Sequence, residues 1–68
     1  MAKMKNEDFL REAKLILDFL SVARFENTST PALMEVAKAA MESGDGRFAF
    51  EKATSAKAMF DFEMRNLK

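Results

Sequence analysis

The amino-acid sequence predicts an all-α protein, and three observations lead to this fold class. Strand-forming residues are scarce, because the 68-residue chain has one isoleucine, two valines and neither tyrosine nor tryptophan. Alanine, leucine, methionine, lysine and glutamate dominate the composition, and these residues favour helices. The single proline, Pro31, and the only glycines, Gly44 and Gly46, divide the chain into three stretches. We therefore expect one domain over residues 1–68, built from three helices.

The first helix is expected over about residues 7–25. Asn6 is a suitable N-cap, since its side-chain oxygen can accept a hydrogen bond from a free amide of the first turn. Glu7 and Asp8 add negative charge to that turn, where the helix dipole favours it.

The second and third helices are bounded by clearer signals. The second is expected over about residues 31–43, with Thr30 as its N-cap, Pro31 as its first residue and Gly44 directly after its end. The third is expected over about residues 46–66, with Asp45 as its N-cap. Short connections predict that sequential helices are antiparallel neighbours. We expect a small three-helix unit that associates into a larger helical bundle.

The composition excludes several kinds of site. Without cysteine there is no disulfide and no thiolate zinc site, and without histidine the usual general base and commonest metal ligand are missing. Eleven basic and eleven acidic residues give zero net charge, which argues against nucleic acid as a partner. No stretch approaches the roughly 20 apolar residues of a membrane span. We expect a cytoplasmic protein that is not an enzyme and uses no cofactor, metal or membrane.

Two of the predicted helices carry more apolar surface than one small core can bury. Besides its main apolar face, each has a second stripe on another side. We expect these stripes to form an interface with a second copy or a partner protein, since monomers rarely expose large apolar patches. The alternative is that long side chains such as Lys52 and Arg65 cover them. The predicted interface residues are Leu15, Phe19 and Val22 in the first helix and Phe48, Met59 and Phe62 in the third.

The function predicted from this pattern is stoichiometric binding. A homodimer or higher homo-oligomer comes first, because symmetric homo-oligomers are the commonest assemblies. A further protein partner is expected, which gives the chain the role of a regulator, adaptor or inhibitor. A phage origin suits such a chain without being shown by it.

Two other functions remain open. The turn between the first two helices contains several hydroxyl and amide groups beside a helix N-terminus, and a cation in the last turn of the first helix can reach it, which predicts a site for a small anion or nucleotide. Capping and a polar turn explain the same residues without any ligand, and short hydroxyl-rich turns of this kind are common. The second alternative is helix-turn-helix DNA binding through residues Arg47 to Ser55, although the mixed charges there suit phosphates poorly. The residues of the anion site are Arg24, Asn27, Thr28, Ser29 and Thr30.

Overall fold

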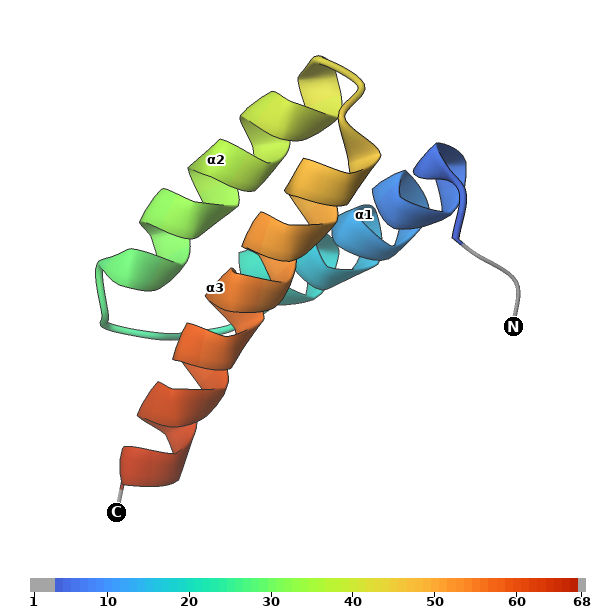
Figure 1. Ribbon diagram of the computed structural model, residues 1–68. Helices are drawn as coiled ribbons and strands as arrows, with labels where there is room; N and C mark the ends of the chain where they lie inside the picture. Colours follow the sequence, from blue (N-terminus) through green and yellow to red (C-terminus); the bar gives the residue numbers. More distant parts are fainter. Residues whose placement is uncertain (1–3, 68) are drawn as a thin grey trace.

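The computed structural model describes residues 4–67 and confirms the all-α fold class (Figure 1). Its helices are α1 (Asn6–Val22), α2 (Ser29–Glu42) and α3 (Gly46–Asn66). Residues 4–67 contain no strand.

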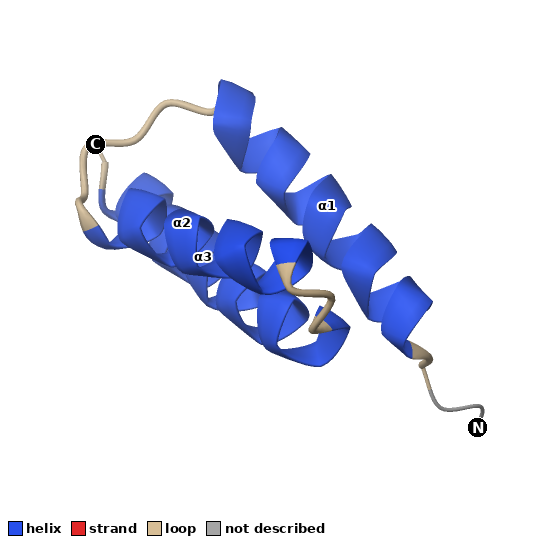
Figure 2. Cartoon of the chain, turned by 90° about the horizontal axis from the view of Figure 1, so that it is seen from above, coloured by secondary structure: helices blue, strands red, loops and turns tan. Residues whose placement is uncertain are grey.

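The longest helix, α3, is the centre of the arrangement, because α1 and α2 both pack against it and make little contact with each other. Helices α2 and α3 are antiparallel neighbours, as expected (Figure 1). By contrast, α1 runs in the same general direction as α3: Asn6 lies at the start of α3, whereas Phe19 lies beside Phe60 near its end. Helix α1 therefore lies at one edge of the molecule, to one side of the α2–α3 pair (Figure 2).

The core is built mainly from small side chains. Six of the nine buried apolar residues are alanine, and those of α3 are completely inaccessible to solvent. Alanines let the helix backbones approach closely but bury little apolar area each. Larger apolar side chains consequently lie at the margin of the core or on the surface. The nine buried residues are Ala13, Leu17, Leu20, Met34, Ala37, Ala40, Ala49, Ala53 and Ala56.

The start of α1 differs from the expectation by one residue. Lys5 occupies the N-cap position, and its amide donates to Asp8 Oδ2 at 3.1 Å. Asn6 is the first helical residue, and its side chain contacts the α2–α3 turn instead of capping its own helix.

Helix α1 is three residues shorter at its C-terminal end than the expected range of 7–25. The helix ends at Val22, and Ala23 is extended, with φ −82° and ψ 154°. Leaving the helix allows Phe25 to turn back onto α3, where its ring meets the edge of Phe60 with centroids 6.2 Å apart. This tertiary contact accounts for the early end, since residues 23–25 contain neither glycine nor proline.

The predicted cap of α2 is also corrected. The helix begins at Ser29, with Thr28 in the N-cap position, and ends at Glu42. The acceptor for the first turn is Asn27, whose Oδ1 receives the Thr30 amide at 2.6 Å. Thr30 is fully buried. Pro31 still lies within the first turn, where its missing N–H needs no partner.

The turn between α2 and α3 follows the predicted pattern. Gly44 has φ +81°, and its amide donates to the Met41 carbonyl at 3.0 Å, while the Asp45 amide donates to the Ala40 carbonyl at 2.9 Å. These two bonds form a Schellman motif, in which glycine is favoured at the left-handed position. Asp45 then caps α3 by accepting the Phe48 amide at 3.2 Å. The predicted bounds of α3 are confirmed.

Candidate functional site

The predicted interface residues lie mostly on the surface. Five of the six are exposed, and Met59 is half-buried. Val22 is 82% exposed and Phe62 63% exposed, which are large fractions for apolar side chains. The same is true of Leu67, which was not among the predicted residues and is 61% exposed.

Three of these residues form what we call the α1 patch: Leu15, Phe19 and Val22. They follow one another on successive turns of α1, because spacings of four and three residues return to the same side of a helix. Phe19 packs partly on α3, with its ring edge-on to Phe60 at a centroid distance of 5.5 Å. Lys57 lies over the same ring, with Nζ 5.8 Å from its centroid. The patch therefore borders the junction between α1 and α3.

Phe48 and Phe62 lie on another side of the molecule. Phe62 follows Lys57 by five residues, which places it about 140° further round the helix. Because Lys57 lies over Phe19, Phe62 points well away from the α1 patch. Phe48 is near the other end of α3, and Lys52 Nζ lies 5.3 Å from its ring centroid. The six predicted residues therefore occupy separate surfaces, and a lysine partly covers Phe48 as the alternative interpretation proposed.

The predicted anion site contains an anion, but it is a side chain of the protein itself. Glu63 of α3 receives the amides of Glu26 and Asn27, each at 2.8 Å, and the Asn27 side-chain amide at 2.5 Å. These bonds favour the charged carboxylate and hold the pKa of Glu63 below its ordinary value of 4.5, with the Asn27 side chain as the largest cause. Asn27 thus joins three segments, because its Oδ1 also caps α2.

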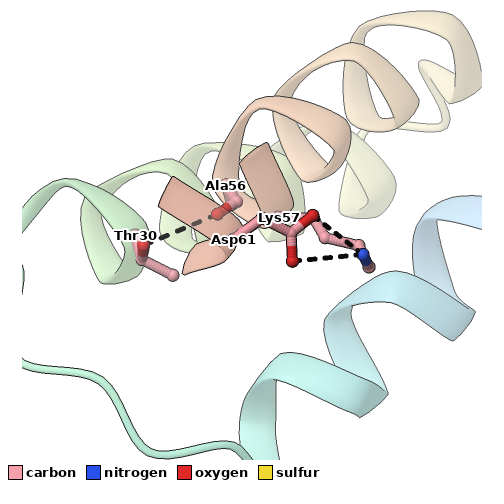
Figure 3. Close-up of polar contacts among 4 residues, drawn as sticks. All are labelled: Thr30, Ala56, Lys57 and Asp61. Atoms are coloured by element: carbon pink, nitrogen blue, oxygen red, sulfur yellow. Dashed lines mark hydrogen bonds and ion pairs between the residues drawn. The ribbon is translucent and has the colours of Figure 1, made fainter. Parts of the chain in front are cut away.

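The other residues of the predicted anion site are not gathered around one point. Thr30 faces inward, with its hydroxyl donating to the Ala56 carbonyl at 3.5 Å (Figure 3). Arg24 is exposed and takes part in none of the ion pairs found among residues 4–67. Thr28 and Ser29 are also exposed. The structure therefore brings Asn27 and Thr30 together, and their contacts serve the capping and packing of α2.

Sequence analysis did not single out Glu63, although one signal could have identified it. Ala56, Phe60, Glu63 and Leu67 follow one another at spacings of four, three and four, so Glu63 interrupts an apolar line on α3. A carboxylate in such a line needs polar partners. Its partners are 36 and 37 residues away in the chain and have no local sequence signal.

A pocket of about 510 Å³ lies beside this junction, where the loop after α1 meets the end of α3. Its walls are mainly apolar, with one basic and two acidic residues among them. The Glu63 carboxylate is already hydrogen-bonded, whereas Arg24 is free to meet solvent. The lining residues are Ala23, Arg24, Phe25, Glu26, Glu63, Met64 and Leu67.

The surface proposed for DNA binding carries mixed charge, with Glu51 between the basic residues Arg47 and Lys52. Arg47 and Glu51 form an ion pair on α3 at 3.7 Å, which leaves that side of the helix without a basic excess. The part of the chain that the structure describes contains no cluster of three or more metal-ligating side chains. Within residues 4–67, every helix is too short or too polar to cross a membrane.

Comparison with known proteins yields no relative: no protein-family model, curated protein or solved structure matches the chain.

Proposed function

We propose that the chain is a non-enzymatic helical protein of the cytoplasm that self-associates and acts by stoichiometric binding to a macromolecular partner. A regulator, adaptor or inhibitor fits this description. The observation that carries the proposal is the exposure of large apolar side chains, while the core is built mainly from alanine. Val22, Phe62 and Leu67 are each more than 60% exposed. Fully burying one such side chain contributes about 1.5–3 kcal/mol, so association that covers them is favourable.

The separation of the apolar surfaces supports binding to two neighbours at once. The α1 patch and Phe62 point away from each other, so a second copy on one surface leaves the other free. A chain of this kind can assemble with itself and still present an apolar surface to another protein. Apolar contacts leave the side chains on both surfaces covalently unchanged, which suits a role without turnover.

The test is the mass of the chain in solution across a concentration series, measured by sedimentation equilibrium. We expect the mass to rise above that of the 7.7 kDa monomer as concentration increases. Hydrogen exchange at low and high concentration then identifies the protected helices, since only an interface gains protection with concentration. A constant monomer mass, with exchange that does not change, contradicts self-association.

A second candidate function is the binding of a small anionic or nucleotide ligand beside Arg24. The pocket lined by Arg24 and Phe25 supports it, because an apolar wall lies next to an exposed guanidinium, whereas the Glu26 and Glu63 carboxylates in the same lining oppose a negative ligand. The amides of residues 26 and 27 are already bonded to Glu63, so the attraction rests on Arg24. Calorimetry with phosphate and a panel of nucleotides tests it: we expect binding heat that Arg24→Ala abolishes. No heat at millimolar ligand contradicts this candidate.

A further inference from the structure

We propose that two copies of this chain dimerise by exchanging α1, so that α1 of each copy packs on α3 of the other. The exchanged helix makes the same contacts that it makes with its own α3 in the single chain. Residues 23–25 are the hinge, and they become helical in the dimer. This inference rests on the proposed self-association and specifies how the second copy is held.

The hinge has a sequence that favours a helix and a structure that is not helical. Residues 23–25 contain neither glycine nor proline, and alanine and arginine, the first two of them, are among the best helix formers. The helix nevertheless ends at Val22, because Phe25 turns back to meet Phe60. Within residues 4–67, the amides of Arg24 and Phe25 donate no hydrogen bond. The closed chain therefore gives up three helical residues to keep α1 on its own α3.

A single copy cannot satisfy both preferences. The loop after α1 crosses to the α2–α3 pair and reverses the direction of the chain before Ser29 (Figure 2). Extension of α1 to Phe25 would carry the end of the helix about 4.5 Å further along its axis and leave only residues 26–28 for this return. Glu26 and Asn27 among them are already fixed to Glu63. In the exchanged dimer α1 leaves its own α3, so the loop no longer has to reverse here and the helix can extend.

The contacts of α1 identify a second copy as the partner. Helix α1 packs on α3 and on the α2–α3 turn and makes little contact with α2. Since the α2–α3 part of a second copy offers the same groups in the same geometry, exchange replaces each contact of α1 by an identical one. A different protein would have to reproduce this surface. The contacts are those of Asn6 with Gly46 at 2.7 Å, of the Phe9 and Phe50 rings at 5.3 Å, and of the Phe19 and Phe60 rings at 5.5 Å.

Hydrogen bonds confine the movement to the hinge. The amides of Glu26 and Asn27 each donate to the Glu63 carboxylate at 2.8 Å, and Asn27 Oδ1 accepts the Thr30 amide at the start of α2. These bonds join the loop to α2 and α3 and do not involve α1, so they persist when α1 leaves. Residues 26–66 therefore keep their structure in both forms, and only residues 23–25 change conformation.

Two effects oppose each other in the exchanged dimer. Each hinge gains helical hydrogen bonds, and each copy loses the contact between Phe25 and Phe60 that holds the closed form. The contacts of α1 with α3 cancel, because they are present in both forms. Since α1 has to leave α3 before it can be exchanged, we expect the dimer to form slowly at high concentration and to dissociate slowly on dilution. Both rates should rise steeply with temperature, as unfolding rates do.

The direct test is isotope-filtered NMR on the dimer of the full chain. Carbon-13-labelled and unlabelled chains are mixed in denaturant and refolded together at high concentration. Exchange predicts nuclear Overhauser effects from labelled to unlabelled chains between the rings of Phe9 and Phe50 and between those of Phe19 and Phe60. In a dimer of closed chains the same contacts occur only within one chain.

The outcomes separate this inference from the proposed function. A dimer that shows these effects between chains supports both. A dimer that shows them only within chains overturns the exchange of α1 and leaves self-association intact. A wild-type chain that stays monomeric at its highest attainable concentration, after warming and slow cooling, overturns both. Hydrogen exchange adds a second readout, because the amides of Arg24 and Phe25 gain protection in the exchanged dimer when they become helical.

Substitutions in the hinge should change the dissociation constant in opposite directions, measured by sedimentation equilibrium. Ala23→Gly disfavours the helical hinge, which occurs twice in each dimer, so we expect the constant to rise about tenfold or more. Ser21→Gly is the matched control, because Ser21 is helical in both forms and the constant should not change.

Phe25→Ala removes a contact of the closed form only, so we expect the constant to fall about fivefold or more. Circular dichroism confirms that each variant keeps its helices. Dissociation constants of Ala23→Gly and Phe25→Ala that both equal the wild-type value overturn the hinge.

Discussion

The side chain of Asn6 is joined to the backbone of Gly46, forty residues later in the chain. The Gly46 amide donates to Asn6 Oδ1 at 2.7 Å, and Asn6 Nδ2 donates to the Gly44 carbonyl at 3.0 Å. One amide side chain thus satisfies a donor and an acceptor of the α2–α3 turn and fixes the start of α1 against it. Gly46 is required at this contact because a Cβ there would overlap the Asn6 carbonyl oxygen.

Gly46→Ala is expected to destabilise the fold. The added methyl group would lie 2.7 Å from Asn6 Oδ1 and 3.1 Å from Phe9 Cβ, besides overlapping the Asn6 backbone. Relief requires α1 to move away from the turn, and overpacking of this kind costs about 1–3 kcal/mol. Urea unfolding followed by circular dichroism measures the change. An unaltered midpoint contradicts the close approach of α1.

A double-mutant cycle isolates the Asn6–Gly46 contact. Asn6→Ala removes both hydrogen bonds to the turn and is expected to lower stability by itself. If Gly46→Ala acts by disrupting the same contact, the two changes are less than additive. Full additivity shows that the cost of Gly46→Ala arises elsewhere.

Glu63→Gln is expected to lower the midpoint of unfolding. The carboxylate accepts three N–H groups from residues 26 and 27, whereas a glutamine side chain has one oxygen and would turn an NH₂ group towards a donor. The loop after α1 loses its attachment to α3, so its amides should exchange faster in the variant. Glu35→Gln is the control, because it removes an exposed carboxylate in the interior of α2. Equal shifts of the unfolding midpoint in the two variants would show that the loss of negative charge, and not the loss of the hydrogen bonds to residues 26 and 27, lowers stability.

The contribution of Glu63 is expected to depend on pH. Its pKa in the folded state is lowered below 4.5 by hydrogen bonds from Asn27 and Glu26. A lowered folded pKa means that the stabilisation is fully present above the unfolded pKa and is lost as pH falls through the folded pKa. The difference in unfolding free energy between wild type and Glu63→Gln should therefore shrink below pH 4.5. A difference that stays constant down to the acid transition contradicts this assignment.

The parts of the fold that follow from the sequence are those with local signals. Gly44 and Asp45 mark the α2–α3 turn within a few residues, and the bounds of α3 follow from them. The end of α1 depends instead on Phe25 meeting Phe60, a contact across 35 residues. The attachment of Asn27 to Glu63 is equally remote. The exposure of Val22 and Phe62 follows from the sequence, because each lies on a second apolar side of its helix that one small core cannot bury. Their placement on separate surfaces does not, because it depends on the central position of α3.

Substitutions at Thr30 distinguish its packing role from the capping role expected from the sequence. Thr30 is fully buried, and its hydroxyl makes one long hydrogen bond of 3.5 Å to the Ala56 carbonyl (Figure 3). Thr30→Val keeps the volume and loses only this bond, so we expect a loss of about 1 kcal/mol or less. Thr30→Ala also leaves a cavity and should cost more. Asn27→Ala removes the actual cap of α2 and should cost about 0.5–2 kcal/mol from capping alone, with the loss of the Glu63 contact in addition. Equal losses in Thr30→Val and Thr30→Ala, measured by urea unfolding, would show that the hydroxyl and not the packing of Thr30 stabilises α2.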